Sequence, residues 1–134
     1  MSVQWRRLPS LALLALLLSP SSGALRVWES VPDFAVRPLE GPAFEFIEAA
    51  RTHAAVVVVF LSVVCPYSNS HEEVLRDLDA RYGSQGLLLV GINSNRTETV
   101  EEVAAHARLR GQAFPIMKDA GNKVADLFGA RVTP

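Results

Sequence analysis

The sequence predicts an α/β domain built around two neighbouring parallel strands. Two predominantly apolar runs, at residues 56–61 and 87–93, lack the alternation of a half-exposed strand and are typical of central strands covered on both faces. The segment between them, residues 66–82, places apolar side chains at helical spacing. A strand–helix–strand unit of this kind is expected to form a right-handed crossover within one sheet.

The composition suits one globular domain and argues against a nucleic-acid partner. The chain has 134 residues, of which 49% are hydrophobic and 20% are charged. Its formal net charge is −1 and its basic residues are scattered. We therefore expect no nucleic-acid surface, because such a surface requires clustered positive charge.

The first 24 residues have the pattern of a secretory signal peptide. Arg6 and Arg7 precede the apolar run 11–18, and Ser22 and Ala24 provide small residues at the −3 and −1 positions of a cleavage site. The apolar run is shorter than the roughly 20 residues that span a bilayer. We expect a cleaved signal peptide at 1–24, export to a periplasm or secretory pathway, and one domain at 25–134. An uncleaved anchor is the alternative and would be the only link to a membrane.

Short extended segments are expected before the first apolar strand. Residues 31–36 and 44–46 are separated by a turn at 41–42, so the two segments can form a small hairpin. Residues 47–52 predict one or two helical turns. These elements would form an N-terminal extension of the sheet.

The helix after the first strand has two possible starts and two possible ends. Pro66 suits the first helical position, whereas Ser70 with Glu73 would form a capping box and start the helix later. Either Gly83 or Gly86 ends it. The face expected to lie in the core consists of Val74, Leu75, Leu78 and Tyr82.

A second capping box, Thr99 with Glu102, predicts a helix that runs to about residue 110. Its expected core face consists of Val100, Val103, Ala104 and Ala107. We expect Glu98, Glu101 and Glu102 to be exposed to solvent. Their negative charges would stabilise the N-terminus of this helix through the helix dipole. Residues 93–95 are expected to turn the chain into this helix, and 95–97 form a glycosylation sequon.

The last part of the chain predicts short elements only. Residues 114–116 are expected to be extended. Asn122 can cap a short helix that runs through Phe128, and Gly129 can close it. Residues 131–134 are expected to be extended again.

Cys65 is the one cysteine of the chain, and it stands where the first apolar strand gives way to a helix. Unpaired backbone N–H groups and the helix dipole favour a thiolate at such a place. Since structural cysteines of exported proteins usually come in pairs, a single one is a candidate reactive thiol. A small buried apolar side chain is the alternative. His53, His71 and His106 lack the spacing of metal ligands, so we expect no metal and no cofactor.

A series of short motifs extends over residues 32–134 and resembles the thioredoxin-like superfamily, in its redoxin branch related to peroxiredoxins and alkyl hydroperoxide reductase. The motifs are Pro32-Asp33-Phe34, 57–60 with Cys65-Pro66-Tyr67, 91–95, Phe114-Pro115 with Asp119, and Ala125 with Phe128-Gly129-Ala130 and Thr133-Pro134. The resemblance implies a thioredoxin-like fold: a central sheet with flanking helices. That fold continues beyond its cis-proline with a hairpin and a helix. We therefore expect the domain to be incomplete at its C-terminus.

The resemblance also assigns roles to site residues. Cys65 matches the first cysteine of the Cys-x-x-Cys motif, and Thr133-Pro134 match the cis-proline segment that faces it. Ser68 occupies the position of the second cysteine. Pro66 and Ser68 are expected to support the site, with Ser68 either a weak donor near the thiolate or a residue of the helix start. Cys65 can therefore form a mixed disulfide, but its release needs another thiol.

The leading hypothesis is an exported redoxin that uses Cys65 in thiol–disulfide exchange with a protein or a small thiol. A thiol-dependent peroxidase is the first alternative. Its motif Pro-x-x-x-Thr/Ser-x-x-Cys is only half matched, because Ser62 is present but Val58 stands at the proline position. The second alternative is a non-catalytic binding module in which Cys65 is merely buried.

Overall fold

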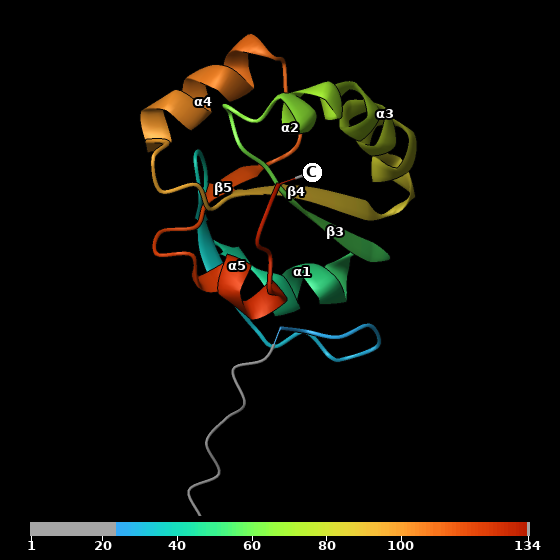
Figure 1. Ribbon diagram of the computed structural model, residues 1–134. Coiled ribbons are helices and arrows are strands. Elements are labelled where there is room, and N and C mark those ends of the chain that lie inside the picture. The colour runs from blue at the N-terminus through green and yellow to red at the C-terminus, as the bar shows by residue number, and fades with distance from the viewer. Residues whose placement is uncertain (1–23, 134) are drawn as a thin grey trace, which may run out of the picture.

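The computed structural model describes residues 24–133, and five strands in this part of the chain form one mixed sheet (Figure 1). Its strand order is β2-β1-β5-β4-β3. The strands are β1 (Ala35–Pro38), β2 (Phe44–Glu45), β3 (Ala55–Phe60), β4 (Leu87–Asn93) and β5 (Ile116–Lys118). The predictions for residues 1–23 and for Pro134 lie outside the described residues.

The parallel pairing of the two apolar runs is confirmed. Strands β3 and β4 are parallel, with Ala55 opposite Leu87 and Phe60 opposite Ile92. Strand β5 continues the parallel part next to β4, and β1 joins it antiparallel. The predicted hairpin is also present, because β1 pairs antiparallel with β2.

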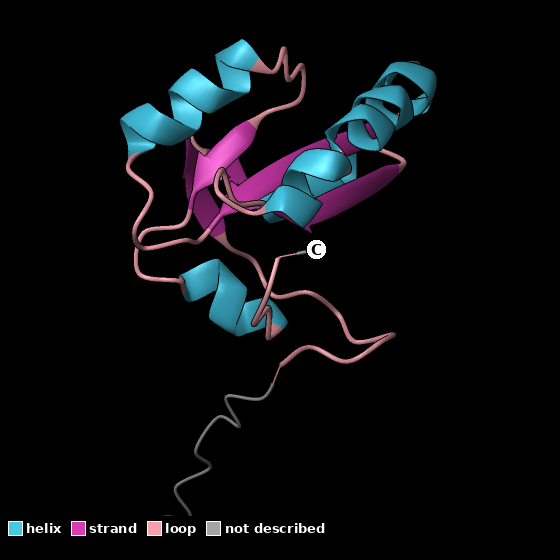
Figure 2. Cartoon of the chain, turned by 45° about the horizontal axis from the view of Figure 1, so that its top comes forward, coloured by secondary structure: helices cyan, strands magenta, loops and turns pink. Residues whose placement is uncertain are grey.

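Helices cover both faces of the sheet (Figure 2). Helices α1 and α5 lie on one face, and α2, α3 and α4 lie on the other. The helices are α1 (Phe46–Thr52), α2 (Pro66–Ser70), α3 (Glu72–Tyr82), α4 (Val100–Leu109) and α5 (Lys123–Phe128). A short 3-10 turn, Gly83–Gln85, follows α3. None of the helices in the described part is long and apolar enough to cross a membrane.

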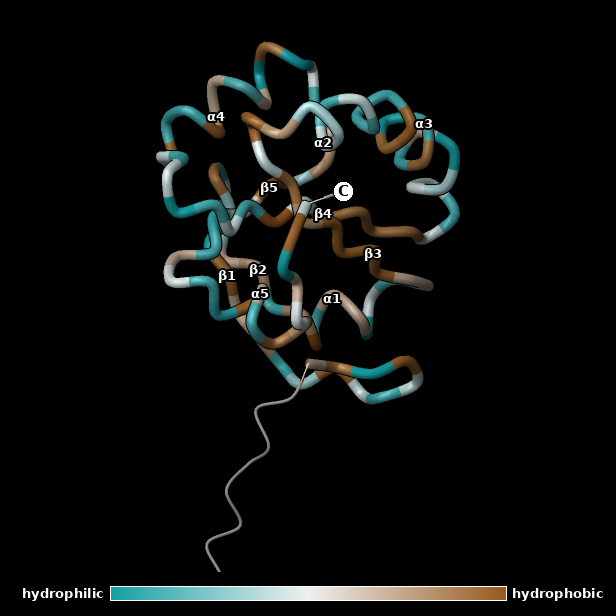
Figure 3. The backbone as a smooth tube through the Cα atoms, viewed as in Figure 1, coloured by the Kyte–Doolittle hydropathy of each residue, from teal (hydrophilic) through white to brown (hydrophobic). Residues whose placement is uncertain are grey.

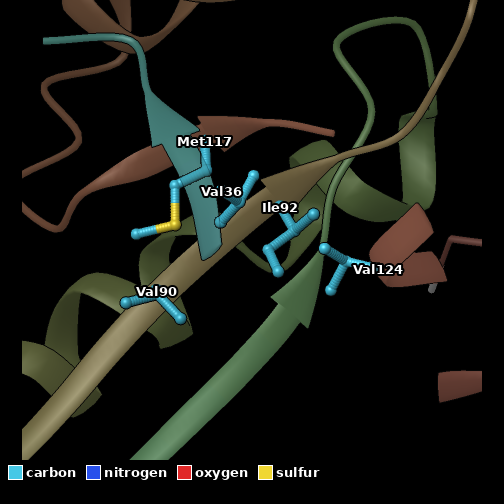
Figure 4. Close-up of a cluster of buried hydrophobic side chains, with 5 residues drawn as sticks. All are labelled: Val36, Val90, Ile92, Met117 and Val124. Carbon is cyan, nitrogen blue, oxygen red and sulfur yellow. The ribbon is translucent and has the colours of Figure 1, made fainter. Parts of the chain in front are cut away.

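The apolar strands in the centre of the molecule separate two cores (Figure 3). Consecutive residues of β4 point to opposite faces: Leu89 belongs to the core under α3 and α4, and Val90 to the core over α1 and α5. Figure 4 shows the second of these cores, which consists of Val36, Val90, Ile92, Met117 and Val124. Burial on both faces explains why β4 lacks polar alternation.

The helix predicted between the two apolar strands is interrupted. It starts at Pro66, ends at Ser70 and resumes at Glu72, so the alternative start at a Ser70–Glu73 capping box is wrong. In a continuous helix the Tyr67 carbonyl would accept from the N–H of His71. It accepts instead from the Ser70 hydroxyl at 2.8 Å and from Nδ1 of the His71 ring at 2.7 Å. The His71 N–H bonds the carbonyl of Ser68.

Part of each predicted core face is wrong. Leu75 and Leu78 pack on the core as expected, but Val74 is 63% exposed and Tyr82 is 41% exposed. On α4, Val103 is buried, whereas Val100 is 44% exposed. The misassigned residues lie at the ends of these helices or beside a better-placed apolar neighbour.

The N-terminus of α5 is capped by a different residue from the one predicted. Asn122 has a left-handed backbone, with φ 59°, and its side chain makes no cap hydrogen bond. The buried carboxylate of Asp119 accepts instead from the N–H groups of Val124 and Ala125. Gly129 closes the helix with φ 65°, as predicted.

Candidate functional site

Cys65 lies between β3 and α2, at the carboxyl end of a parallel strand. Its backbone is extended, with φ −81° and ψ 115°, so it is the N-cap residue of α2, and Pro66 occupies the first turn. The side chain is half-buried. Val64 before it and Tyr67 after it are both 71% exposed.

The surroundings of the thiol favour its charged form. The Thr133 hydroxyl donates to the sulfur and is the largest influence that lowers the pKa of Cys65 below its ordinary value. The backbone N–H groups of Ser68 and Tyr67 act in the same direction. Partial burial and the negative charge of Glu98 raise the pKa, but less strongly, so the net shift is downward. Local hydrogen bonds therefore stabilise the thiolate.

Ser68 supports the site through two different groups. Its backbone N–H faces the thiol, as described above, while its hydroxyl accepts from the N–H of Ser62 at 3.2 Å. The side chain is buried, with only 2% exposed. This bond joins the first turn of α2 to the end of β3, and it leaves a hydroxyl where a dithiol motif would have a second sulfur.

A buried carboxylate holds the loop that leads to Cys65. Glu98 is 4% exposed, so the prediction of a solvated charge is wrong. Two consecutive N–H groups of the loop donate to it, from Val63 at 3.0 Å and from Val64 at 3.1 Å. Its other donors are the side chains of Ser62, Asn93 and Asn95.

These hydrogen bonds decide the charge state of Glu98. Burial alone would raise the pKa of its carboxyl group. The bonds from Ser62, Asn93 and the loop N–H groups outweigh burial and lower the pKa below its ordinary value. A charged glutamate therefore lies beneath the loop, and its hydrogen bonds explain why a charged group is tolerated there.

The residues predicted to turn the chain after β4 form part of this network. Asn93 is buried and donates to Glu98, while its carbonyl oxygen Oδ1 accepts from Lys118 at 2.6 Å. Asn95, the first residue of the sequon, donates its amide to Glu98 at 2.9 Å. Burial lowers the pKa of Lys118, and the charges of Glu98 and Asp119 oppose that shift.

A cleft of about 540 Å³ opens beside the thiol, between the ends of β3 and β4 and the segment after α5. Thr133, which bonds the sulfur, lies in its wall, as do Ser62 and Asn95. Figure 1 shows the C-terminal segment running back across the sheet toward the start of α2. Pro134, predicted to face Cys65, lies outside the described residues.

The side chains of His71 and His106 contact a backbone carbonyl and a carboxylate, respectively. Within residues 24–133, no group of three or more His, Cys, Asp and Glu side chains is arranged to hold a metal ion. His71 directs its Nδ1 to the carbonyl of Tyr67 rather than to the thiol. His106 lies 3.6 Å from Glu72, between α3 and α4.

The sequence matches the model of one protein family. The match is to the family described as AhpC/TSA, and it covers residues 27–134, well over half of the chain. The chain belongs to the AhpC/TSA family. The matched part contains Cys65, Glu98 and Thr133, so the site lies wholly within the region that AhpC/TSA proteins share.

Individual relatives agree with this AhpC/TSA membership. The chain is 27% identical over 138 residues to the thiol-disulfide oxidoreductase ResA of Halalkalibacterium halodurans, across 97% of this chain and 76% of ResA. A solved hypothetical protein from Sinorhizobium meliloti has a TM-score of 0.70 and 32% identity, and covers 80% of this chain. The chain spans 61% of the length of that protein.

The thioredoxin-like fold expected from the resemblance is confirmed. A putative thioredoxin from Neisseria meningitidis has a TM-score of 0.68, over 78% of this chain and 67% of its own length. At 20% identity this likeness concerns the fold alone.

Proposed function

We propose that this protein is an exported, single-cysteine thiol–disulfide oxidoreductase with Cys65 as its nucleophile. The observation that carries the proposal is the environment of the thiol. Its pKa is lowered by the Thr133 hydroxyl and by backbone N–H groups at the start of α2. Only a thiolate attacks disulfides, so this environment prepares Cys65 for exchange.

The reaction begins when the Cys65 thiolate attacks one sulfur of a partner's disulfide. A new disulfide joins Cys65 to the partner, and the partner's second sulfur leaves as a thiolate. Ser68 cannot resolve this mixed disulfide, because a hydroxyl does not replace a thiol in exchange. Another thiol, from a small molecule, a partner protein or a residue beyond 134, must attack the mixed disulfide to release the partner and restore Cys65.

The similarity to ResA supports this reaction class, because that relative is named a thiol-disulfide oxidoreductase. The proposed export rests on the N-terminal sequence, in which Arg6-Arg7 and an apolar run precede small residues. Disulfide-bonded proteins, the proposed partners, are common in the compartments reached by export.

The peroxidase alternative has less support. In the peroxidase motif, the Ser/Thr three residues before the cysteine belongs to the active site, and Ser62 holds that position. Here the Ser62 hydroxyl donates to Oε1 of Glu98 at 2.5 Å. A hydroxyl whose proton is donated to a buried carboxylate cannot also donate that proton to a peroxide.

Two variants test the proposed exchange. In an assay of disulfide reduction with an added small thiol, Cys65→Ser is expected to lose all activity and to form no mixed disulfide by mass spectrometry. Ser68→Cys restores a dithiol motif and is expected to shorten the lifetime of the mixed disulfide. Undiminished exchange in Cys65→Ser would overturn the proposal.

A further inference from the structure

The cleft beside Cys65 combines an apolar floor with a cationic rim. Phe60, Leu61 and Ala125 provide apolar lining, and Arg96 and Arg131 reach it from separate loops. Its volume of about 540 Å³ lies within the usual range of small-molecule sites. It adjoins the sulfur through Thr133, which lines the cleft and bonds Cys65.

Neither arginine is neutralised within the described residues. The ion pairs among the described residues join Glu72 or Glu40 to basic residues on α4 or just after it, and none includes Arg96 or Arg131. Arg96 makes one long hydrogen bond, from Nε to the amide oxygen of Asn122 at 3.4 Å. Both arginines are exposed and available to a ligand in the cleft.

Two carboxylates near the cleft, Glu98 and Asp119, are committed to other groups, while Glu29 and Asp126 line a neighbouring cavity that Arg131 also borders. Glu98 is buried beneath the loop before Cys65 and accepts from that loop and from neighbouring side chains. Asp119 is buried and accepts from the first N–H groups of α5 and from Ser94. The cleft therefore presents positive charge to its contents, without an exposed acidic group in its lining.

We propose that this cleft binds the small thiol that resolves the mixed disulfide on Cys65, and that this thiol carries a carboxylate. The inference rests on the proposed function, in which a thiol other than that of Cys65 resolves the mixed disulfide because Ser68 stands at the position of the second cysteine. Guanidinium groups bind carboxylates by paired hydrogen bonds, and the apolar floor accommodates the carbon chain of the ligand.

The chemistry balances with two molecules of the small thiol. The first attacks Cys65 Sγ in the mixed disulfide as a thiolate, so the partner leaves as a thiolate and a disulfide forms between Cys65 and the small thiol. The second attacks the small thiol's sulfur in that disulfide and releases the Cys65 thiolate and an oxidised dimer. The two electrons that reduce the partner's disulfide thus come from two small thiols.

The test compares three thiols of different charge on one preformed disulfide. Cys65 is first joined by a disulfide to the neutral thiol 4-thiopyridine. Attack on the Cys65 sulfur releases 4-thiopyridine, and the absorbance of the released thiol measures the rate. The attacking thiols are 3-mercaptopropionate, which is anionic, 2-mercaptoethanol, which is neutral, and cysteamine, which is cationic. Each rate is divided by the fraction of the attacking thiol that is ionised. It is then divided by the rate of the same thiol with a small-molecule pyridyl disulfide, which corrects for the intrinsic reactivity of the thiol.

We expect 3-mercaptopropionate to be favoured and cysteamine to be disfavoured, with the difference shrinking as salt is added. Arg96→Gln and Arg131→Gln should each reduce the advantage of 3-mercaptopropionate by about two- to fivefold, the range for an exposed ion pair. Arg81→Gln, an exposed arginine on α3, is the matched control and should leave it unchanged.

The outcomes separate the two proposals. If Cys65 forms no disulfide with the pyridyl reagent, or no thiol resolves it, the proposed function fails. If all three thiols resolve it with no charge preference, exchange stands and the cleft assignment is overturned. A preference that survives in the Arg96→Gln, Arg131→Gln double variant would also overturn the assignment.

Discussion

Oε1 of Glu98 accepts a hydrogen bond from the backbone N–H of Val64, at 3.1 Å, one residue before Cys65. The same carboxylate accepts from Val63 at 3.0 Å. Two consecutive backbone groups of the loop are thus fixed to a buried charge on the next strand–helix connection. The position of the thiol depends on a residue more than thirty positions away in the sequence.

Replacing Glu98 by glutamine should loosen this loop. The amide offers one acceptor oxygen to five donors, from Ser62, Val63, Val64, Asn93 and Asn95. Leaving buried donors without a partner costs about 1–3 kcal/mol in unfolding free energy. Urea denaturation measures the loss, and Glu101→Gln, on the exposed first turn of α4, is the control and should change stability by less than about 0.5 kcal/mol. Equal losses in the two variants would contradict the role of Glu98.

The stability of the wild-type protein should also depend on pH through Glu98. Its pKa is lower in the folded than in the unfolded chain, because the hydrogen bonds to its carboxylate outweigh burial. The stabilisation is therefore fully present above the ordinary glutamate pKa of about 4.3 and is lost as pH falls through the lower folded value. Denaturation followed from pH 7 into the acid range should show a decline that is smaller in Glu98→Gln.

Thr133→Val should make the thiol less reactive at neutral pH. The change removes the hydroxyl that most strongly lowers the pKa of Cys65 while it keeps the volume of the side chain. The pKa should rise, so alkylation of Cys65 should be slower at neutral pH and its pH profile should move upward. Thr52→Val removes a hydroxyl that donates to the end of α1 and should leave the profile unchanged. Identical profiles for both variants would show that Thr133 does not stabilise the thiolate.

The central strands and the position of Cys65 could be predicted because local sequence determines them. Residues 55–60 and 87–93 are apolar on both faces, and this pattern depends only on burial within a parallel sheet. The capping box of Thr99 and Glu102 is similarly local, and both of its hydrogen bonds are present. These predictions needed no knowledge of distant contacts.

The Glu98 network could not be predicted in this way. Its partners Ser62, Val63 and Val64 come from the other strand–helix connection, so only the folded sheet brings them together. One signal was nevertheless present. Glu98 precedes the predicted N-cap Thr99 and so lies outside the helix whose first turn it was expected to favour.

Gly91→Ala should disturb the packing beneath the Cys65 loop. A Cβ atom at Gly91 would lie 2.7 Å from Cδ1 of Leu61 and 3.3 Å from Phe114 and Ile116. Leu61 is buried and begins the loop, so it cannot move without shifting its neighbours. Overpacking of this kind costs about 1–3 kcal/mol, measurable by urea denaturation.

Gly83→Ala is the matched control for that substitution. Gly83 has a helical backbone, with φ −57°, and an added Cβ would meet only Oδ1 of Asp79 at 3.8 Å. Alanine there should leave stability unchanged or raise it by up to about 1 kcal/mol. If both glycine variants behaved alike, the close approach of Leu61 to Gly91 would not limit the side chain at that position.

Glu72→Gln should weaken the contact between α3 and the end of α4. Glu72 is 5% exposed and accepts from Nε of Arg110 at 2.6 Å and from the side chain of Gln112 at 3.2 Å. An uncharged amide loses the charge-assisted bond, so unfolding should become easier by about 1–3 kcal/mol. Glu73→Gln changes the exposed neighbour on the same helix turn and should have little effect.

A double-mutant cycle distinguishes loss of this bond from general damage to α3. If Glu72 acts through Arg110, the losses in Glu72→Gln and Arg110→Gln should not add in the double variant, because each removes the same bond. Strict additivity would mean that the two residues stabilise the protein independently. Because α3 follows α2 directly after His71, non-additivity would also show that the helix pair carrying Cys65 is anchored to α4 through a buried charge.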